Sequence, residues 1–481
     1  MRGGNPRRCR HNATIGRSSV GLVRPPARQN SGGCSKKNDT AWAGFHSCEA
    51  LACRMTQTTL FPMSLVGAAR RSREGSFVDN MRLPVHRWFR YSAGFSAQWV
   101  EHEIKRRSGD RTITVLDPFA GSGTTLIAAG QSGVESIGVE AHPFIARVAA
   151  AKLLCDGDAS EYLRRAQEVL KLAVSSEPAA LTYPTLIHRC YAPASLDQLD
   201  RLRRAYVLSA DGSDQSELVW LTLVSILRVV STAGTAPWQY VLPNKSKAKV
   251  AEPFTAFSRM SHLIASDMEE IGRNSMNRST LFVGDARSCS DVCDDSVDLV
   301  LTSPPYANNY DYADATRLEM SFMGEISGWA DLQAKVRMHL VRSCSQHVPM
   351  KGSSVDTIVS HSALAPIRDE LLTVCRELAE VRLGRGGRKT YHLMVASYML
   401  DMAQVWLAMR RVTRSGGSAC FVIGDSAPYG VYVPVVNWLG RLAVHAGFDD
   451  WKFEKIRDRN VKWKNRKHRV PLVEGRLVIA G

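Results

Sequence analysis

The chain has 481 residues, of which 44% are hydrophobic and 22% are charged, so it has enough apolar side chains to build a packed core. The formal net charge of +16 lies entirely at the two ends, because residues 1–80 contribute +9, residues 451–481 contribute +7 and the middle is neutral. No apolar run is long enough to cross a bilayer and the eleven cysteines form no Cys-x-x-Cys pair, which excludes a membrane-spanning protein and predicts a cytoplasmic protein with reduced thiols and no metal site.

The first 80 residues are rich in Arg, Ser and Gly, poor in acids and without hydrophobic periodicity. We therefore predict a disordered basic extension over 1–80 that is dispensable for folding. An organelle transit peptide and a true start at Met81 are the alternatives. We expect order from about Pro84 and one large domain over 81–481, in which Ser96 caps a helix that follows a dense group of aromatic residues.

A glycine-rich loop over residues 117–124 is the first functional signal. A β-rich run ends at Asp117, and a helix opens at Thr124. Gly121 and Gly123 allow a tight turn and the close approach of a ligand to the backbone. The loop lacks both the Gly-Lys-Ser/Thr of a phosphate loop and the third spaced glycine of the dinucleotide fingerprint. The next predicted strand ends at Glu140, where an acid suits the recognition of ribose hydroxyls.

Residues 156–275 interrupt the alternation of strands and helices. Helices are expected at 161–174, 195–207 and 216–230, because leucines recur there at helical spacing. Between 235 and 249 a predicted loop mixes aromatic residues with Asn244, Lys245, Lys247 and Lys249. That mixture suits contact with nucleic acid, and an exposed linker is the alternative.

The second functional signal is the pentapeptide Thr-Ser-Pro-Pro-Tyr at 302–306. It follows the apolar run 297–301, which is typical of a buried strand, and another predicted strand ends shortly before it at Asp285. Two prolines cannot continue a sheet ladder, so they end the strand in a rigid polar loop. In open α/β sheets, ligands bind at this edge.

The remaining segments complete an α/β pattern. We expect helices in 317–382, 393–411 and 434–446, a strand at 419–424, and two final strands at 450–456 and 476–480. This alternation predicts a doubly wound, mainly parallel sheet, in which the last hairpin contributes one antiparallel strand. Seven basic residues between the final strands suggest a clamp for nucleic-acid phosphates, with a solvated surface loop as the alternative: Arg457, Arg459, Lys462, Lys464, Arg466, Lys467 and Arg469.

Together, Asp-Pro-Phe-Ala-Gly-Ser-Gly-Thr at 117–124 and the pentapeptide at 302–306 resemble the cofactor loop and the catalytic motif of amino-group DNA methyltransferases. The resemblance covers about 84–481. It implies a Rossmann-like class I methyltransferase fold with a helical insertion at 156–275, which would serve as a cap or a target-recognition region. It also implies S-adenosylmethionine as cofactor and double-stranded DNA as substrate. Whether the enzyme acts alone or beside a restriction or defence system stays open.

The same resemblance assigns site residues. The implied cofactor-binding residues are Phe95, Asp117, Pro118, Phe119, Gly121, Gly123, Thr124, Glu140 and Asp285. Glu140 would hold the ribose and Asp285 the adenine amine. The implied catalytic residues are Ser303, Pro304, Pro305 and Tyr306. Ser303 Oγ and the Pro304 carbonyl would accept hydrogen bonds from the target amine, and Tyr306 would stack on a base flipped out of the duplex. The DNA-binding residues would be Lys462, Lys464, Arg466 and Lys467.

Two observations reduce the number of base atoms that the enzyme could methylate. No Pro-Cys dipeptide occurs, so the covalent chemistry of cytosine-C5 enzymes is discarded. In the family, Ser at the position of Ser303 is commoner among cytosine-N4 enzymes, and Asp or Asn among adenine-N6 enzymes, which favours cytosine N4. The order of the two motifs here departs from the reversed order of many cytosine-N4 enzymes. An RNA amino-methyltransferase and a catalytically silent DNA-binding subunit stay open as competing hypotheses.

Overall fold

The structure is a computed structural model. It describes residues 77–91, 94–109, 111–236, 239–273, 276, 279–308, 310–348, 352, 354–386, 389–459 and 470–481. Most of the predicted N-terminal extension lies outside these ranges. The predicted DNA-binding residues Lys462, Lys464, Arg466 and Lys467 lie outside them as well, so their role stays a prediction.

A seven-stranded sheet with the order β5-β2-β1-β6-β7-β9-β8 organises the described residues. The strands are β1 (Thr114–Asp117), β2 (Glu135–Glu140), β5 (Ser279–Val283), β6 (Val297–Thr302), β7 (Thr413–Gly424), β8 (Asp450–Arg459) and β9 (Leu472–Ala480). β9 runs antiparallel to both of its neighbours, and the other pairs in this sheet are parallel. The predicted mainly parallel sheet with one antiparallel strand is therefore confirmed.

The strand order reverses at β1, which lies between β2 and β6. Leu116 of β1 pairs with Ile137 on one side and with Val300 on the other. Because all three strands are parallel, Asp117, Glu140 and Thr302 end at the same edge of the sheet. Doubly wound sheets bind ligands at such a switch point.

Helices cover both faces of the sheet, because successive side chains of a strand point to opposite faces. Val115 and Leu299 pack with α2 (Ala97–Ser108) and α3 (Thr124–Gln131). Leu116 and Val300 pack in a second core with α14 (Tyr391–Val412) and α15 (Val435–His445). Ser96 caps α2 as predicted, since its side chain accepts a hydrogen bond from the Trp99 N–H. The sequence alternation along each strand thus fixes which helix layer it contacts.

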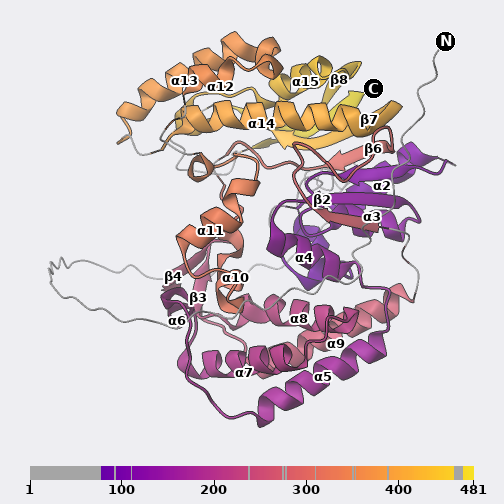
Figure 1. The fold of residues 1–481 in the computed structure, drawn as a ribbon, viewed down its shortest axis with the longest axis vertical. Coiled ribbons are helices and arrows are strands. Elements are labelled where there is room, and N and C mark those ends of the chain that lie inside the picture. The colour runs from indigo at the N-terminus through magenta and orange to yellow at the C-terminus, as the bar shows by residue number, and fades with distance from the viewer. Residues whose placement is uncertain are drawn as a thin grey trace, which may run out of the picture. The chain divides into compact units, whose positions relative to one another are not determined.

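The described residues of the stretch 156–275 form five helices and a hairpin. The helices are α5 (Ala159–Ser175), α6 (Thr185–Cys190), α7 (Pro193–Ser209), α8 (Asp214–Val230) and α9 (Pro253–Ile271), and α5, α7, α8 and α9 pack together below α4 (Pro143–Lys152) in Figure 1. The predicted loop at 235–249 is partly wrong. It contains the antiparallel strands β3 (Ala233–Thr235) and β4 (Val241–Ser246), because Thr235 pairs with Val241 and the Gln239 N–H donates to the Ala236 carbonyl.

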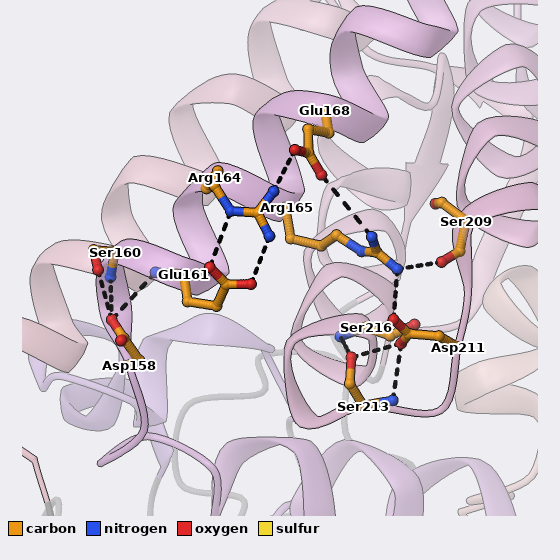
Figure 2. A network of polar contacts seen from close by, with 10 residues as sticks. All are labelled: Asp158, Ser160, Glu161, Arg164, Arg165, Glu168, Ser209, Asp211, Ser213 and Ser216. Atoms are coloured by element: carbon orange, nitrogen blue, oxygen red, sulfur yellow. Dashed lines mark hydrogen bonds and ion pairs between the residues drawn. The ribbon is translucent and has the colours of Figure 1, made fainter.

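A polar network ties α5 to the connection between α7 and α8 (Figure 2). Asp158 caps α5 and Ser213 caps α8. Between them, Arg165 donates to the Ser209 carbonyl and to the carboxylate of Asp211. Exposed ion pairs of this kind contribute at most about 1 kcal/mol each, so their role is to orient the helices, whose stability comes from the apolar core they share.

The segment after β6 is helical, as expected. It contains α10 (Arg317–Met323), α11 (Trp329–Lys335), α12 (Val355–Val359) and α13 (Arg368–Leu383). Short 3-10 turns precede α2, at Phe77–Arg82 and His86–Trp88. None of the helices in the described ranges is long and apolar enough to span a membrane.

Candidate active site

A cavity lies at the carboxyl ends of β1, β2, β5 and β6 and encloses about 760 Å³, including its part open to solvent. Seven of the nine predicted cofactor residues line it: Phe95, Pro118, Phe119, Gly121, Thr124, Glu140 and Asp285. Ser303 and Pro305 of the pentapeptide line the same cavity. Asp117, Gly123, Pro304 and Tyr306 do not line it. The two sequence signals, far apart along the chain, therefore meet at one site.

The glycine loop approaches the cavity through its backbone. Gly121 has a φ of +53°, and a Cβ there would lie 3.3 Å from the Tyr91 ring. Its N–H donates to Glu140 Oε2 at 2.7 Å, which ties the loop to the end of β2. Gly123, with a φ of +85°, is the N-cap of α3, where a Cβ would lie 3.3 Å from Ala149. Gly121 thus shapes the cavity wall, and Gly123 shapes the helix behind it.

Glu140 is the acid at the end of β2. Its carboxylate accepts hydrogen bonds from the Gly121 N–H and from the His142 N–H, at 2.7 and 2.8 Å. Burial raises the pKa of Glu140 to about 7, more than these two hydrogen bonds lower it. The group therefore titrates near neutral pH and presents remaining oxygen lone pairs to the cavity.

The resemblance implies that Asp117 holds the cofactor, but its side chain does not line the cavity. Its side chain is fully buried and accepts three hydrogen bonds: from the Phe119 N–H at 3.0 Å, and from Thr125 Oγ1 and Thr302 Oγ1 at 2.6 Å each. Burial raises the pKa of Asp117 to about 6. Because Thr302 is the first residue of the pentapeptide, Asp117 connects the glycine loop to the catalytic loop and holds the two in register. Thr302 was not singled out from the sequence.

Asp285 lines the cavity with its carboxylate already bound to an arginine. Arg287 donates from its backbone N–H and from Nε, each at 2.9 Å. Arg287 also reaches the buried Asp401, which Arg342 holds through a second ion pair. Arg287, Arg342 and Asp401 were missed from the sequence, because they come from distant segments that only the fold brings together.

The catalytic loop is fixed on both sides of its two prolines. Ser303 Oγ donates to the Val422 carbonyl of β7 at 3.2 Å, so the oxygen lone pairs are left to accept a hydrogen bond. The Tyr306 N–H donates to Tyr312 Oη at 3.4 Å. Beyond it, the buried Ser426 hydroxyl donates to the Ala307 carbonyl. These bonds anchor the loop to β7, to Tyr312 and to Ser426.

Two members of the predicted basic clamp lie in a strand of the sheet and not in the loop between the final strands. Arg457 and Arg459 belong to β8 and both pair with the buried Glu474 of β9, so the prediction that they lie in the loop is wrong, and their contact with phosphates stays a prediction. The Arg459 guanidinium lies 5.0 Å from the centroid of the Tyr306 ring, and its Nη1 donates to the Asp425 carbonyl. β8 extends beyond its predicted end at 456 because Arg457, Asp458 and Arg459 still pair with β9. Arg459 therefore backs the catalytic tyrosine.

Two buried polar atoms at the cavity have no hydrogen-bond partner in the described part of the chain. They are Ser122 Oγ and His142 Nδ1. Burial lowers the pKa of His142 to about 3, so its ring is neutral. Buried polar atoms are normally paired. Unpaired atoms in a cavity of this size fit a polar ligand, together with the carboxylates of Glu140 and Asp285.

Three potential metal ligands do lie together, although the sequence predicted no metal site. The ligand atoms of Asp311, Cys344 and His347 are within 4.8 Å of one another and all three residues are buried. Asp311 already pairs with Arg337 and with His347. Burial raises the pKa of the Cys344 thiol to about 12, which keeps it protonated. The contacts of Asp311 with Arg337 and His347 instead connect the segment after the catalytic loop to residues 337–347.

Asn80 falls inside the predicted dispensable extension, yet it is buried and supports the cavity. Its Nδ2 donates to the Phe95 carbonyl at 2.8 Å, and its Oδ1 accepts from the Ala97 N–H at 3.0 Å. Phe95 lines the cavity. The boundary at Met81 is therefore wrong by several residues, because a single buried Asn leaves no periodic signal in a polar, basic segment.

Replacing Asn80 by alanine should weaken both the fold and the cavity. An unpaired buried polar group costs about 1–3 kcal/mol, and the Ala97 N–H would lose its partner. We expect a lower melting temperature and several-fold weaker cofactor binding by calorimetry. A chain that begins at Met81 should share both defects, whereas the neighbouring exposed Met81→Ala should have neither. Equal stability of the Asn80→Ala variant and the wild type would contradict the role given to Asn80.

Taken together, the strand order, the single reversed strand and a cavity shared by a glycine loop and a Pro-Pro loop define the class: a Rossmann-like methyltransferase. The N6/N4 methyltransferase family, described as DNA methylase, matches residues 54–151, which contain the glycine loop and Glu140. This match begins upstream of Met81, in line with the correction at Asn80.

Similar proteins agree with that match. The chain is 22% identical over 425 residues to the type II methyltransferase M.BsoBI of Geobacillus stearothermophilus, covering 80% of this chain and 82% of the relative. It is 25% identical to the type II methyltransferase M.AvaI of Anabaena variabilis, covering 78% and 81%. A 69-residue stretch, 14% of this chain and 13% of the relative, is 41% identical to the type II methyltransferase M.MjaII of Methanocaldococcus jannaschii. An rRNA methyltransferase structure from Streptomyces viridochromogenes has a TM-score of 0.22 at 12% identity, covering 79% of this chain and 83% of that one, a likeness that carries no weight.

The chain thus matches the N6/N4 DNA methylase family over residues 54–151 and resembles type II methyltransferases along about four fifths of its length, which supports the amino-group DNA methyltransferase family that the two motifs predicted. It is a methyltransferase, and its methyl donor is S-adenosylmethionine.

Proposed function

We propose that this protein methylates an exocyclic amine of a base in double-stranded DNA, and that the base is cytosine, modified at N4. The observation that carries this proposal is the shared cavity: Ser303 and Pro305 face the same space as Gly121, Glu140 and Asp285. A cofactor held by the last three residues would therefore be next to a base held by the catalytic loop.

The cavity residues fit S-adenosylmethionine by their chemistry. Glu140 supplies a carboxylate for ribose hydroxyls, Asp285 an acceptor for the adenine amine, and Phe95 an apolar surface for the adenine ring. The unpaired Ser122 hydroxyl is a further donor or acceptor for the polar amino-acid end. When bound, the cofactor supplies an electrophilic methyl group on a sulfonium.

The catalytic loop has to make a poor nucleophile react. The lone pair of an exocyclic amine is delocalised into its ring, so the site needs an acceptor that localises it and a fixed alignment. Ser303 directs its proton to the Val422 carbonyl, which leaves its oxygen free to accept from the amine. Proximity and alignment contribute up to about 7–11 kcal/mol in the most favourable cases. Pro304 and Pro305 supply the rigidity that this alignment demands.

Tyr306 would receive the flipped base on its ring. Stacking on an aromatic ring is worth about 1–3 kcal/mol per base. One side of the ring faces the guanidinium of Arg459, which is anchored to Asp425 and Glu474. That contact fixes the ring orientation before the base arrives, so Arg459 acts as a positioning residue.

The choice of cytosine rests on Ser303, the residue commoner in cytosine-N4 members of the family. Nucleoside mass spectrometry of duplex DNA treated with the wild-type enzyme tests it. We expect N4-methylcytosine. N6-methyladenine would overturn the choice of base and leave the site intact, and methylated RNA with unmodified DNA would overturn the DNA proposal.

Cofactor affinity should depend on pH through Glu140, whose pKa is raised to about 7. The ionised carboxylate accepts hydrogen bonds from ribose hydroxyls, so affinity should fall as the pH is lowered through 7, by up to about tenfold per unit. Calorimetric titrations at pH 6, 7 and 8 measure this, and Glu140→Gln should flatten the profile. An unchanged slope in that variant would show that Glu140 is not the ribose acceptor.

The stability of the free protein should change in the opposite direction. A carboxyl with a raised folded-state pKa contributes stability below its unfolded pKa of about 4.5 and loses it as the pH rises through 7. Glu140 should thus make the cofactor-free protein more stable at pH 5.5 than at pH 7.5, relative to Glu140→Gln. The opposite signs separate cofactor binding from simple destabilisation.

A further inference from the structure

The hairpin of β3 and β4 presents a basic surface that the proposed chemistry does not use. Residues 231–251 contain three lysines and no Asp or Glu. Lys245 and Lys249 are exposed and form no ion pair within the described ranges. Arg189 of α6 is a third exposed cation and donates to Asn244 Oδ1. We call Arg189, Asn244, Lys245 and Lys249 the hairpin surface.

The turn of this hairpin is attached to the active site. Tyr240 Oη accepts a hydrogen bond from the Asp311 N–H at 2.7 Å, and its ring lies 5.4 Å from the Tyr310 ring. Gln239 Nε2 donates to the Arg90 carbonyl at 2.8 Å, next to Tyr91 in the cavity wall. In Figure 1, β3 and β4 lie beside α6 and α10, away from α5 and α2. The hairpin is thus attached by hydrogen bonds to the segments that surround the active site.

A short chain of contacts links the hairpin to the catalytic motif. Tyr310 packs edge-on against Tyr312 at 4.5 Å, and Tyr312 Oη accepts from the Tyr306 N–H. From behind, Arg228 donates to the Gln239 carbonyl at 2.7 Å while its ion pair with the buried Glu319 holds it in place. A displacement of the hairpin would therefore be transmitted through Tyr310 and Tyr312 to the loop that carries Tyr306.

The hairpin surface lies within reach of DNA whose target base is held at the catalytic loop, because Tyr240 contacts Asp311 just after that loop. Lys245 is five residues after Tyr240, so the two lie at most about 17 Å apart at about 3.3 Å per residue. At 3.4 Å per base pair, that distance is about five base pairs. Lysines are flexible point charges, which bind phosphates without reading sequence.

We propose that the hairpin surface binds the phosphate backbone of the substrate DNA within about five base pairs of the target base, and that Tyr240 couples this contact to the catalytic loop. The inference rests on the proposed function for its substrate. The hairpin surface would contact the DNA backbone in addition to the basic residues predicted at 462–467.

The binding claim is tested with the full chain carrying Lys245→Ala and Lys249→Ala, titrated with a duplex of about 20 base pairs at several salt concentrations. Loss of two phosphate contacts should reduce the log–log salt slope by about 1.8 and weaken binding roughly 10- to 30-fold at 0.15 M salt. Lys105→Ala with Lys171→Ala is the matched control. Both are exposed, lie on α2 and α5, and remove the same net charge. A slope equal to that of the control would overturn the proposal.

The coupling claim is tested by Tyr240→Phe, which removes the hydroxyl that accepts from Asp311 and keeps the ring. We expect the rate at saturating DNA to fall about tenfold, with the DNA dissociation constant and salt slope unchanged. An unchanged rate would overturn the coupling. A wild type that binds DNA through the hairpin but methylates none would sink the proposed function alone. A lysine variant with the control's slope, in an enzyme that methylates DNA, would sink the hairpin proposal alone.

Discussion

Replacing Asp117 by alanine is expected to abolish cofactor binding, with a loss of at least about 100-fold in affinity, and to lower stability. The carboxylate is buried and accepts from Phe119, Thr125 and Thr302. Each buried donor left without a partner costs about 1–3 kcal/mol. Without this acceptor the glycine loop loses its shape and its connection to the catalytic loop. Calorimetric titration with S-adenosylmethionine and a thermal melt measure both effects.

Asp117→Asn is the matched control, because it separates support of the loops from direct contact with the cofactor. Its amide oxygen can accept from Thr302 and Phe119, and the Thr125 hydroxyl can turn to accept from its NH₂ group. We expect Asp117→Asn to keep cofactor affinity within a few fold of the wild type. A loss as large as that of Asp117→Ala, at an unchanged melting temperature, would show that the charged carboxylate itself touches the cofactor.

Replacing Ser303 by alanine should lower the single-turnover rate of methyl transfer by about 100-fold. The loss of one preorganised hydrogen-bond partner at a reacting group typically has this magnitude. Cofactor and DNA affinity should survive, because the contacts of Ser303 Oγ lie within the protein, with the Val422 carbonyl and the Tyr306 side chain. Ser426→Ala, which removes a neighbouring hydroxyl that supports Ala307, tests whether general loosening of the loop has the same effect. If the two variants had equal rates, the assigned acceptor role would be wrong.

Tyr306 extends this prediction to base capture. Tyr306→Ala removes the ring and should slow both capture and methylation, by roughly 5- to 150-fold for 1–3 kcal/mol of stacking. Tyr306→Phe keeps the ring over Arg459 and should remain close to the wild type. Fluorescence of 2-aminopurine at the target position reports the flipped base. A wild-type signal in Tyr306→Ala would contradict the stacking role.

Much of the sheet was predictable because burial on both faces leaves apolar runs that end in polar loops. The strands ending at Asp117, Glu140 and Asp285, and the strand before the pentapeptide, could be located in this way, and their parallel arrangement brings those ends to one edge. The antiparallel strand followed from the final hairpin. The site residues followed from position at strand ends, which the fold converts into proximity.

The parts that could not be predicted depend on contacts between distant segments. Asn80 supports Phe95, Arg287 binds Asp285, and Arg459 backs Tyr306, but none of them stands out locally. The hydrogen bonds of Asp117 to Thr125 and Thr302 could not be predicted either. An Asp at a strand end looks the same in the sequence whether its side chain faces a ligand or a neighbouring threonine. The hairpin at 233–246 was missed because its strands have only three and six residues, and the longer one contains Pro243, Asn244 and Lys245, which are uncommon in strands.

The central claim is that one cavity serves cofactor and base, so the most direct measurement follows a labelled methyl group from S-adenosylmethionine. Wild-type protein, Ser303→Ala and Asp117→Asn are incubated with duplex DNA and with RNA, and the nucleosides are analysed by mass spectrometry. We predict label on an exocyclic amine of DNA, as N4-methylcytosine, with wild type and Asp117→Asn active and Ser303→Ala about 100-fold slower. Label on RNA alone, or no transfer by a wild type that binds the cofactor, would contradict the account.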